Sequence, residues 1–245
     1  MPPVPPPFDG RLVSSRTLTP SVRELVFERV DGQPMAFQPG QWFNAILPVG
    51  GDEALSRSYS IASAPDGSPR FEIAVTRVRD GAGSTWLHEL APGAVLRFIG
   101  PHGFFTRAPA SGPPSLLIAT GTGVTPLRSM IRAAVAAGGT APLWILLGVR
   151  RQDDLLYREE FERLAKEHPF IRFEPTLSQP EGEWSGRRGY VQTHVPGLWK
   201  ELVALGAGEP HAYICGLERM VSSVRDRLKT DLAVPRQQVH SERYD

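Results

Sequence analysis

The spacing of apolar residues divides the chain into two parts. In the first part, short runs of alternating apolar and polar residues are separated by turn residues such as Asp31-Gly32 and Pro92-Gly93. This pattern is typical of an antiparallel barrel or sandwich. We expect strands at Arg11–Ser15, Arg23–Arg29, Gln41–Leu47, Ser58–Ala62, Phe71–Val78 and Val95–Ile99. One helix is expected at Ser84–Leu90, with Ser84 as its N-cap.

After residue 108 the pattern changes to buried apolar runs that alternate with helical segments. Strands are expected at Leu116–Ala119, Leu143–Leu147, Ile171–Pro175 and Tyr213–Cys215, and helices at Pro126–Ala137, Asp153–Glu167 and Glu218–Leu232. Such alternation predicts a doubly wound α/β domain, in which helices cover both faces of a parallel sheet. We therefore predict a proline-rich, disordered lead-in at 1–7, an antiparallel β-barrel domain at 8–108 and an α/β domain at 109–245.

Composition narrows the classes of function. A net charge of +1 does not point to nucleic acid, and no apolar run approaches the length of a membrane helix. With no apparent signal peptide, we expect a cytoplasmic protein, and we expect it to be a monomer. The single cysteine, Cys215, excludes disulfides and any cysteine-ligated zinc or iron–sulfur site within this sequence.

The clearest local signal is a glycine turn between the first buried strand of the α/β domain and the helix that follows it. This turn runs from Ala119 to Pro126 as Ala-Thr-Gly-Thr-Gly-Val-Thr-Pro, with Pro126 expected at the first helical position. Backbone N–H groups and the helix dipole at such a turn favour a pyrophosphate. A turn that only joins a strand to a helix is the alternative, since the spacing is not the usual Gly-x-Gly-x-x-Gly.

In the barrel part, Arg57, Tyr59 and Ile61 fall on one face of a predicted strand, and Ser58 and Ser60 on the other. An arginine beside an aromatic residue suits a ligand that has both a phosphate and a flat ring. An ordinary exposed strand edge is the alternative interpretation.

Six segments in order carry a family resemblance. They are Arg57–Ser60, Gly81–Leu87, Gly100–Phe105, Gly121–Gly123, Tyr213–Gly216 and Glu242–Asp245. Together they resemble the flavin and nicotinamide motifs of the ferredoxin–NADP⁺ reductase family, over nearly the whole chain. In plant-type members the last aromatic residue covers the flavin; here Asp245 follows Tyr244.

The resemblance implies a binding site for FAD in the barrel. Arg57 would hold a phosphate, Tyr59 would stack on the isoalloxazine ring, and Ser60 would lie near N5. The remaining FAD contacts would come from Ser58, Ala74, Val75, Thr76, Gly83, Ser84, Thr85, Thr120 and Tyr244. Because the helix start at Gly83–Thr85 would hold a second phosphate, the resemblance implies FAD rather than FMN.

The resemblance also implies a nicotinamide dinucleotide site. Its pyrophosphate would bind at Gly121, Thr122 and Gly123, its ribose near Thr125, and its nicotinamide beside Cys215 and Gly216. Arg150, Ser178, Arg187 and Arg188 are the candidate contacts for a 2′-phosphate, which favours NADPH. The Trp184–Gly189 segment also resembles reductases that use NADH, so NADH stays an alternative. Ser60, Cys215 and Glu242 are the candidate catalytic residues.

The implied function is hydride transfer from NAD(P)H to FAD, followed by transfer of single electrons to an external ferredoxin or flavodoxin. Two other enzymatic functions stay open: reduction of free flavin, ferric complexes or oxygen, and service as the reductase component of an oxygenase system. A non-catalytic regulatory module is the alternative outside enzymes.

Overall fold

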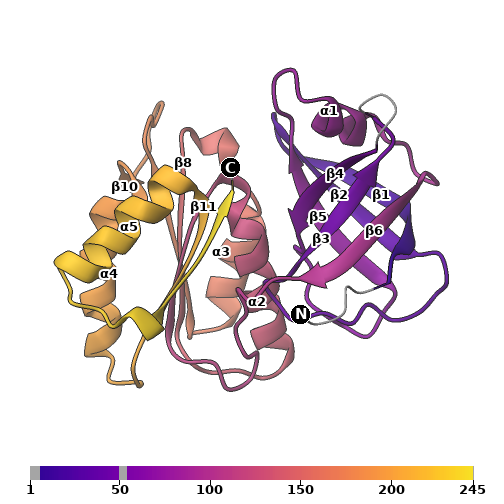
Figure 1. The fold of residues 1–245 in the computed structure, drawn as a ribbon. Helices are drawn as coiled ribbons and strands as arrows, with labels where there is room; N and C mark the ends of the chain where they lie inside the picture. The colour runs from indigo at the N-terminus through magenta and orange to yellow at the C-terminus, as the bar shows by residue number, and fades with distance from the viewer. Residues whose placement is uncertain (1–5, 50–53, 245) are drawn as a thin grey trace.

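The computed structural model describes residues 6–49 and 54–244, which form two domains side by side (Figure 1). Most of the predicted disordered lead-in and the extra residue Asp245 lie outside the described residues. The segment between the two sheets, 103–114, contains the boundary predicted at 108/109. No helix in the described part of the chain is long and apolar enough to cross a bilayer.

The first domain is a six-stranded antiparallel barrel, as predicted. Its strands are β1 (Phe8–Thr19), β2 (Val22–Arg29), β3 (Trp42–Leu47), β4 (Leu55–Ser60), β5 (Arg70–Thr76) and β6 (Val95–His102), in the order β4-β3-β6-β1-β2-β5. Its core is a cluster of aromatic rings from Phe8, Phe27, Phe43, Phe71 and Phe98. The end strands β4 and β5 leave a seam that the Ile61–Ile73 bridge closes.

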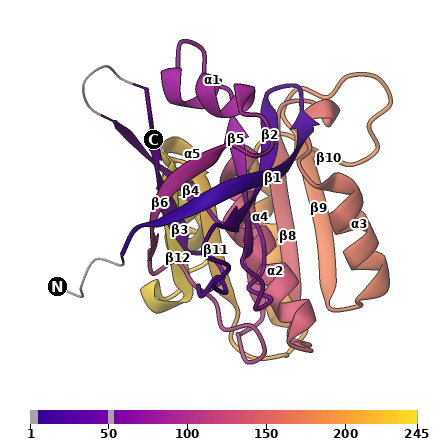
Figure 2. The same cartoon turned by 90° about the vertical axis from the view of Figure 1, so that its right-hand side faces the viewer.

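The second domain is a six-stranded parallel sheet with helices on both faces, again as predicted (Figure 2). Its strands are β7 (Ser115–Thr120), β8 (Leu143–Val149), β9 (Ile171–Leu177), β10 (Arg187–Arg188), β11 (His211–Leu217) and β12 (Val239–Tyr244), in the order β10-β9-β8-β7-β11-β12. Along β7, Leu117 and Ala119 belong to one core, whereas Leu116 and Ile118 belong to the core on the opposite face. This alternation explains the uninterrupted apolar run in the sequence.

The helices of the second domain are α2 (Val124–Ala136), α3 (Arg158–Glu167), α4 (Val191–Ala204) and α5 (Glu218–Thr230). Residues of α2 and α3 pack in the core that faces the barrel, and residues of α4 and α5 pack in the core on the far face. Figure 1 shows α2 next to the barrel and the C-terminal end of the chain at the junction of the two domains. The start of α2 and the end of β12 are therefore positioned to meet the barrel.

Three predicted helix boundaries were wrong. The first helix, α1 (Ala82–Glu89), begins before Ser84, whose hydroxyl donates to the Gly81 carbonyl and accepts the Val78 N–H instead of capping it. The predicted Asp153–Glu167 helix is broken, because Tyr157 adopts a left-handed φ of 55° just before α3. Pro126 lies at the third helical position of α2, because a 3₁₀ turn at Gly121–Gly123 leads directly into the helix at Val124.

Two strands and one α-helix escaped the sequence prediction, the shorter strand being the two-residue β10. α4 contains Pro196 and follows a glycine-rich loop, both of which weaken the helical signal. β12 is a half-buried edge strand with the sequence Val-His-Ser-Glu-Arg-Tyr, which lacks the apolar run of its neighbours. Its register with β11 pairs Cys215 with Glu242 and Leu217 with Tyr244.

Candidate active site at the domain junction

The end of β4 and the end of β12 meet at Ser60. The Tyr244 hydroxyl donates a 2.5 Å hydrogen bond to Ser60 Oγ, and Ser60 Oγ donates one of 3.2 Å to Glu242 Oε1. From the start of α2, Thr125 Oγ1 lies 3.4 Å from the Tyr244 hydroxyl. The structure thus brings together Ser60 and Glu242, 182 residues apart in sequence, with Cys215 on the adjacent strand.

Burial disfavours the charged forms of Glu242, Cys215 and Tyr244. It raises the pKa of Glu242 to about 7, against the smaller opposing effect of the Ser60 hydrogen bond. Burial also raises the pKa of the fully buried Cys215 thiol and that of Tyr244 well above their usual values. Glu242 is therefore the member of the group that titrates near neutral pH, and Cys215 is a packed thiol rather than a thiolate.

The barrel presents a cradle that fits a pyrophosphate. The exposed Arg57 guanidinium is bonded only to the neighbouring Ser56 carbonyl, at 2.8 Å, among the described residues. A Cβ on Gly83 would lie 3.8 Å from Arg57 Cγ, so the start of α1 adjoins this arginine. The helix has no side-chain cap, and its first helical hydrogen bond runs from Thr85 N–H to the Gly81 carbonyl. The earlier N–H groups of α1, including those of Gly83 and Ser84, are left for an anion.

The other flavin candidates follow the seam between β4 and β5. Tyr59 is half-buried against the barrel core, and this burial raises its pKa to about 12. Ser58 Oγ donates to Asn44 Oδ1 at 2.9 Å, so this side chain is held by β3. Ala74, Val75 and Thr76 lie on the end strand β5, although His88 Nε2 already bonds the Val75 carbonyl at 2.8 Å. The seam therefore offers an aromatic ring and strand backbone for a flat ligand.

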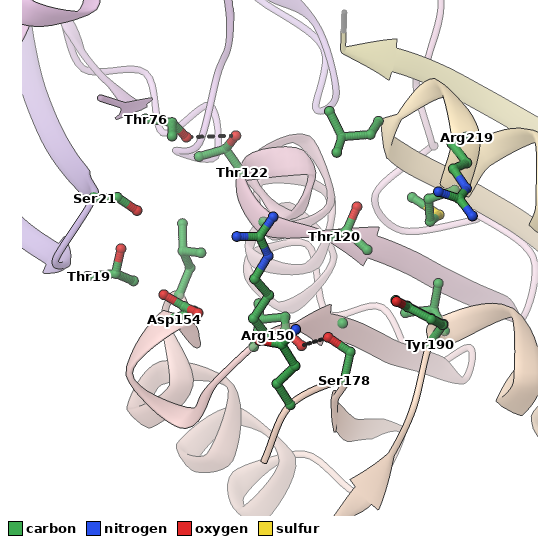
Figure 3. Close-up of a pocket in the computed structure, with 18 of the residues that line it drawn as sticks. Thr19, Ser21, Thr76, Thr120, Thr122, Arg150, Asp154, Ser178, Tyr190 and Arg219 are labelled. Atoms are coloured by element: carbon green, nitrogen blue, oxygen red, sulfur yellow. Dashed lines mark hydrogen bonds between the residues drawn. The ribbon is translucent and has the colours of Figure 1, made fainter. Parts of the chain in front are cut away.

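A pocket of about 680 Å³ opens between the domains at the carboxyl ends of the parallel strands. Such an edge is where open α/β sheets bind ligands. Gly121, with a φ of 52°, and Thr122 line it, and Thr122 Oγ1 lies 3.4 Å from Thr76 Oγ1 of the barrel (Figure 3). Thr120, assigned above to FAD, also lines this pocket, as does the FAD candidate Thr76, and the buried Thr120 hydroxyl has no hydrogen-bond partner among the described residues.

Two glycines assigned to nucleotide binding are also required for packing. A Cβ on Gly123 would lie 2.2 Å from the Cys215 carbonyl oxygen, which no larger residue can accommodate. Gly216 has a φ of 149°, and its Cβ would lie 2.5 Å from Thr120 Oγ1. These two glycines therefore allow the turn after β7 to pack closely against Cys215 and Gly216 at the end of β11.

The candidate 2′-phosphate residues divide into two groups. Arg150 and Ser178 line the pocket, and Figure 3 shows the Arg150 side chain extending into it. Arg187 and Arg188 are not among the described residues that line it. Arg187 pairs with Glu174 at 2.6 Å, and Arg188 donates to the Trp184 carbonyl at 3.0 Å.

Sequence reasoning missed Arg219, which lines the same pocket opposite Arg150 (Figure 3). Its position in the first turn of α5, three residues after Gly216, is the signal that would have identified it. Tyr190, mostly exposed at the start of α4, also lines the pocket. The pocket thus combines two guanidinium groups and an aromatic ring with one carboxylate, Asp154.

Comparison with known proteins agrees with this two-domain site. Residues 9–106 match the family model described as "Oxidoreductase FAD-binding domain", and residues 117–226 match "Oxidoreductase NAD-binding domain". The chain is 60% identical over 240 residues to ferredoxin–NADP reductase B of Sorangium cellulosum, covering 98% of each chain. It is 29% identical to the phenol hydroxylase P5 protein of Acinetobacter pittii, over 97% of this chain and 65% of that protein.

Among solved structures, the cytochrome P450 reductase GcoB of Amycolatopsis superposes with a TM-score of 0.83 at 27% identity. That superposition covers 98% of this chain and 70% of GcoB. The chain therefore belongs to the ferredoxin–NADP⁺ reductase family of oxidoreductases, which combine an FAD-binding and an NAD-binding domain.

Proposed function

We propose that the protein is a ferredoxin–NADP⁺ reductase that uses FAD and prefers NADPH to NADH. The observation that carries the proposal is the junction at Ser60, where the strand of the flavin motif meets Glu242 and Tyr244 of the nucleotide domain. At this junction, a flavin ring bound along the seam between β4 and β5 would lie against a nicotinamide bound at the carboxyl ends of the parallel strands. The 60% identity to the Sorangium reductase supports the choice of acceptor.

The residues of the barrel fit FAD. Arg57 and the free N–H groups of Gly83 and Ser84 would hold its two phosphates, and Tyr59 would lie against its ring. Bound FAD would supply the conversion between two-electron transfer from nicotinamide and one-electron transfer to a carrier. Ser60 and Glu242 would hold a proton at the junction, where the pKa of Glu242 of about 7 suits exchange near neutral pH.

The pocket between the domains would take NADPH. Gly121 and Thr122 would bind the pyrophosphate at the start of α2, and Arg150 and Arg219 would face the 2′-phosphate. Tyr190 would offer its exposed ring to the adenine. We assign the 2′-phosphate to Arg150 and Arg219 rather than to Arg187, because the charge of Arg187 is already balanced by Glu174.

A carrier protein would dock near the same junction. Phe104 is 97% exposed, and it follows Gly103, where an added Cβ would lie 3.9 Å from Glu242 Oε2. An exposed aromatic side chain beside a redox site is a typical contact for a partner protein. We propose that a ferredoxin binds there, and the cytoplasmic location and monomeric state stay predictions from the sequence.

The test is steady-state reduction of candidate ferredoxins by the purified holoprotein, with NADPH and NADH compared. We expect saturation with a ferredoxin and a higher kcat/KM for NADPH. Heat-released cofactor, identified by mass, should be FAD. A colourless protein, or FMN as the sole flavin, would contradict the proposed function at its first step.

Service as the reductase component of an oxygenase system is the second candidate. It is favoured by the likeness to the phenol hydroxylase P5 protein, of which this chain spans 65%. The two functions differ in the acceptor. An oxygenase component, rather than a ferredoxin, would then saturate the NADPH-dependent turnover, and no ferredoxin would raise the rate above that with dissolved oxygen.

A further inference from the structure

An ionic cluster joins the two domains along α2, beyond the turn at Gly121 and Thr122 that lines the pocket. Its centre is Arg128 of α2, whose side chain is 4% exposed. This guanidinium pairs with Glu72 of β5, with Glu160 of α3 at 2.8 Å, and with Glu24 of β2 at 3.8 Å. Its Cζ also lies 4.2 Å from the ring centroid of Tyr157. One side chain thus contacts three strands or helices from both domains.

The cluster balances its own charge. Arg16 of β1 pairs with Glu24, and Arg132, also on α2, pairs with Glu72 at 3.3 Å and with Glu160 at 3.8 Å. Three arginines therefore meet three glutamates at the domain boundary, and the pairs of Arg128 and Arg132 with Glu72 and of Arg128 with Glu24 cross it. The arginines lower the pKa of Glu72, although burial acts to raise it. A buried charge that loses its partner is costly, and Arg128 is the member of this set whose side chain is almost fully buried.

Two consecutive side chains of α2 also hold two consecutive carbonyl groups of the barrel. Arg128 Nη1 donates to the Ala62 carbonyl at 3.0 Å, and Ser129 Oγ donates to the Ser63 carbonyl at 2.6 Å. Ala62 lies two residues after Ser60, the residue at which the flavin strand meets the C-terminus. Arg128 and Ser129 thus hold the backbone segment that immediately follows Ser60.

The same helix reaches the other side of the site. Its second residue, Thr125, lies 3.4 Å from the Tyr244 hydroxyl, which in turn bonds Ser60. α2 therefore fixes the segment after Ser60 through Arg128 and Ser129, and contacts Tyr244 through Thr125. A shift of α2 against the barrel changes the distance between the flavin strand and the nucleotide domain.

We propose that Arg128 is a positioning residue, which with Ser129 latches α2 to the backbone after Ser60 and so sets the approach of nicotinamide to flavin. The predicted effect on flavin reduction rests on the proposed function. The predicted attachment of α2 to the barrel backbone rests only on the contacts described above. Arg128 lines a separate polar groove of about 970 Å³ rather than the nucleotide pocket, so its loss should not weaken NADPH directly.

The test compares Arg128→Gln with Arg132→Gln in the FAD-loaded protein. Arg132 is the matched control, because it pairs with Glu72 and Glu160 as Arg128 does. Its side chain is 37% exposed, and it lies one turn further along α2. In Arg128→Gln, flavin reduction by NADPH in stopped flow should slow by on the order of tenfold to a hundredfold, the cost of a misplaced reactant. The Kd for NADPH should stay within about twofold, because the nucleotide contacts remain.

Hydrogen exchange gives a readout that requires no turnover. The Ala62 N–H bonds the Glu72 carbonyl at 2.7 Å, so amide exchange at 60–64 and 70–73 reports the latch. We expect faster exchange there in Arg128→Gln and wild-type exchange in Arg132→Gln. Wild-type exchange in Arg128→Gln would overturn the proposal, and so would equal kinetic losses in both variants.

Two milder variants keep the test decisive if Arg128→Gln does not fold. Arg128→Lys retains the charge but cannot contact Ala62, Glu72 and Glu160 together, and Ser129→Ala removes a single bond. Each variant should show slower flavin reduction and faster amide exchange at 60–64 and 70–73, to a smaller extent than Arg128→Gln. If neither variant shows either change, the proposed latch is wrong. A protein that reduces no ferredoxin but shows the exchange pattern would contradict the proposed function and leave the latch standing.

Discussion

The Ser60 side chain joins the two domains at the candidate active site. Its hydroxyl is the point at which Glu242 and Tyr244 of the nucleotide domain meet the barrel. Glu242 takes its raised pKa from burial at this point. Arg57, three residues earlier on the same strand, is by contrast exposed and pairs with no carboxylate in the part of the chain that the structure describes. One short strand thus carries both a hydroxyl held at the domain junction and an exposed guanidinium.

We predict that Arg57→Ala weakens FAD binding. A hydrogen bond to a charged group contributes about 1.5–3 kcal/mol, so the Kd should rise about tenfold to a hundredfold. Apoprotein titration with FAD measures this change. Arg70→Ala is the control, because Arg70 is an exposed barrel arginine paired with Glu28. Equal Kd values for Arg57→Ala and the wild type would exclude Arg57 from the phosphate site.

The raised pKa of Glu242 predicts a pH dependence of stability. Between its ordinary value of 4.5 and about 7, the folded protein holds a proton that the unfolded chain releases. The free energy of unfolding should therefore fall as the pH rises through this window, by up to about 3 kcal/mol. Urea unfolding at pH 5 and pH 8 should show a smaller fall in Glu242→Gln than in the wild type. The exposed Glu159→Gln should behave as the wild type does, and a full fall in Glu242→Gln would contradict the assignment.

At the scale of elements, two pieces carry the site: the start of α2 and the strand β12. Gly123 allows the turn before α2 to contact the Cys215 carbonyl, and α2 then runs along the barrel. β12 pairs with β11 in parallel register and carries Glu242 and Tyr244 to the junction. Because β12 is an edge strand, its end can separate from Ser60 without breaking the sheet.

We predict that Tyr244 competes with nicotinamide for the flavin. Aromatic stacking contributes about 0.5–1.5 kcal/mol beyond area burial, so Tyr244→Ala should tighten NADP⁺ binding up to about tenfold. Tyr244→Phe keeps the ring but loses the Ser60 hydrogen bond, and should bind NADP⁺ as the wild type does. Titration of NADP⁺ followed by the flavin absorption spectrum measures both. Identical affinities and spectra in Tyr244→Ala and the wild type would show that the ring does not cover the site.

At the scale of the whole molecule, the nucleotide pocket exists only because the domains meet. Thr76 of the barrel and Thr122 of the α/β domain both line it and approach within 3.4 Å. The contacts of Arg128 with Glu72 and Glu160 lie at the same boundary, further along α2. A ligand bound in this pocket would therefore contact both domains.

We predict that Arg150 and Arg219, and not Arg187 and Arg188, determine the preference for NADPH. Changing both pocket arginines to Ala should raise the KM for NADPH by about tenfold or more, since each charged hydrogen bond is worth about 1.5–3 kcal/mol. The KM for NADH should change little, because NADH lacks the 2′-phosphate. The double variant Arg187→Ala and Arg188→Ala is the matched control. A larger loss for NADPH in that control would reverse the assignment.

The sequence by itself determined the class of each domain and most of the local motifs. Alternating and continuous apolar runs predict the barrel and the doubly wound sheet, because strand burial on one face or on both leaves a direct trace in the pattern. The turn around Gly121 and the segment from Arg57 to Ser60 were identifiable because the residues that define each motif are consecutive in the sequence.

Only the tertiary structure decided which residues share a site. Strand order and helix position decide that Cys215 pairs with Glu242. They also decide that Thr120 lines the pocket between the domains, and that Arg219 lies across this pocket from Arg150. The neutralisation of Arg187 by Glu174 is likewise a contact between β10 and β9. A local pattern shows where a residue lies on its own element, whereas long-range packing determines which charges and hydroxyls lie opposite it.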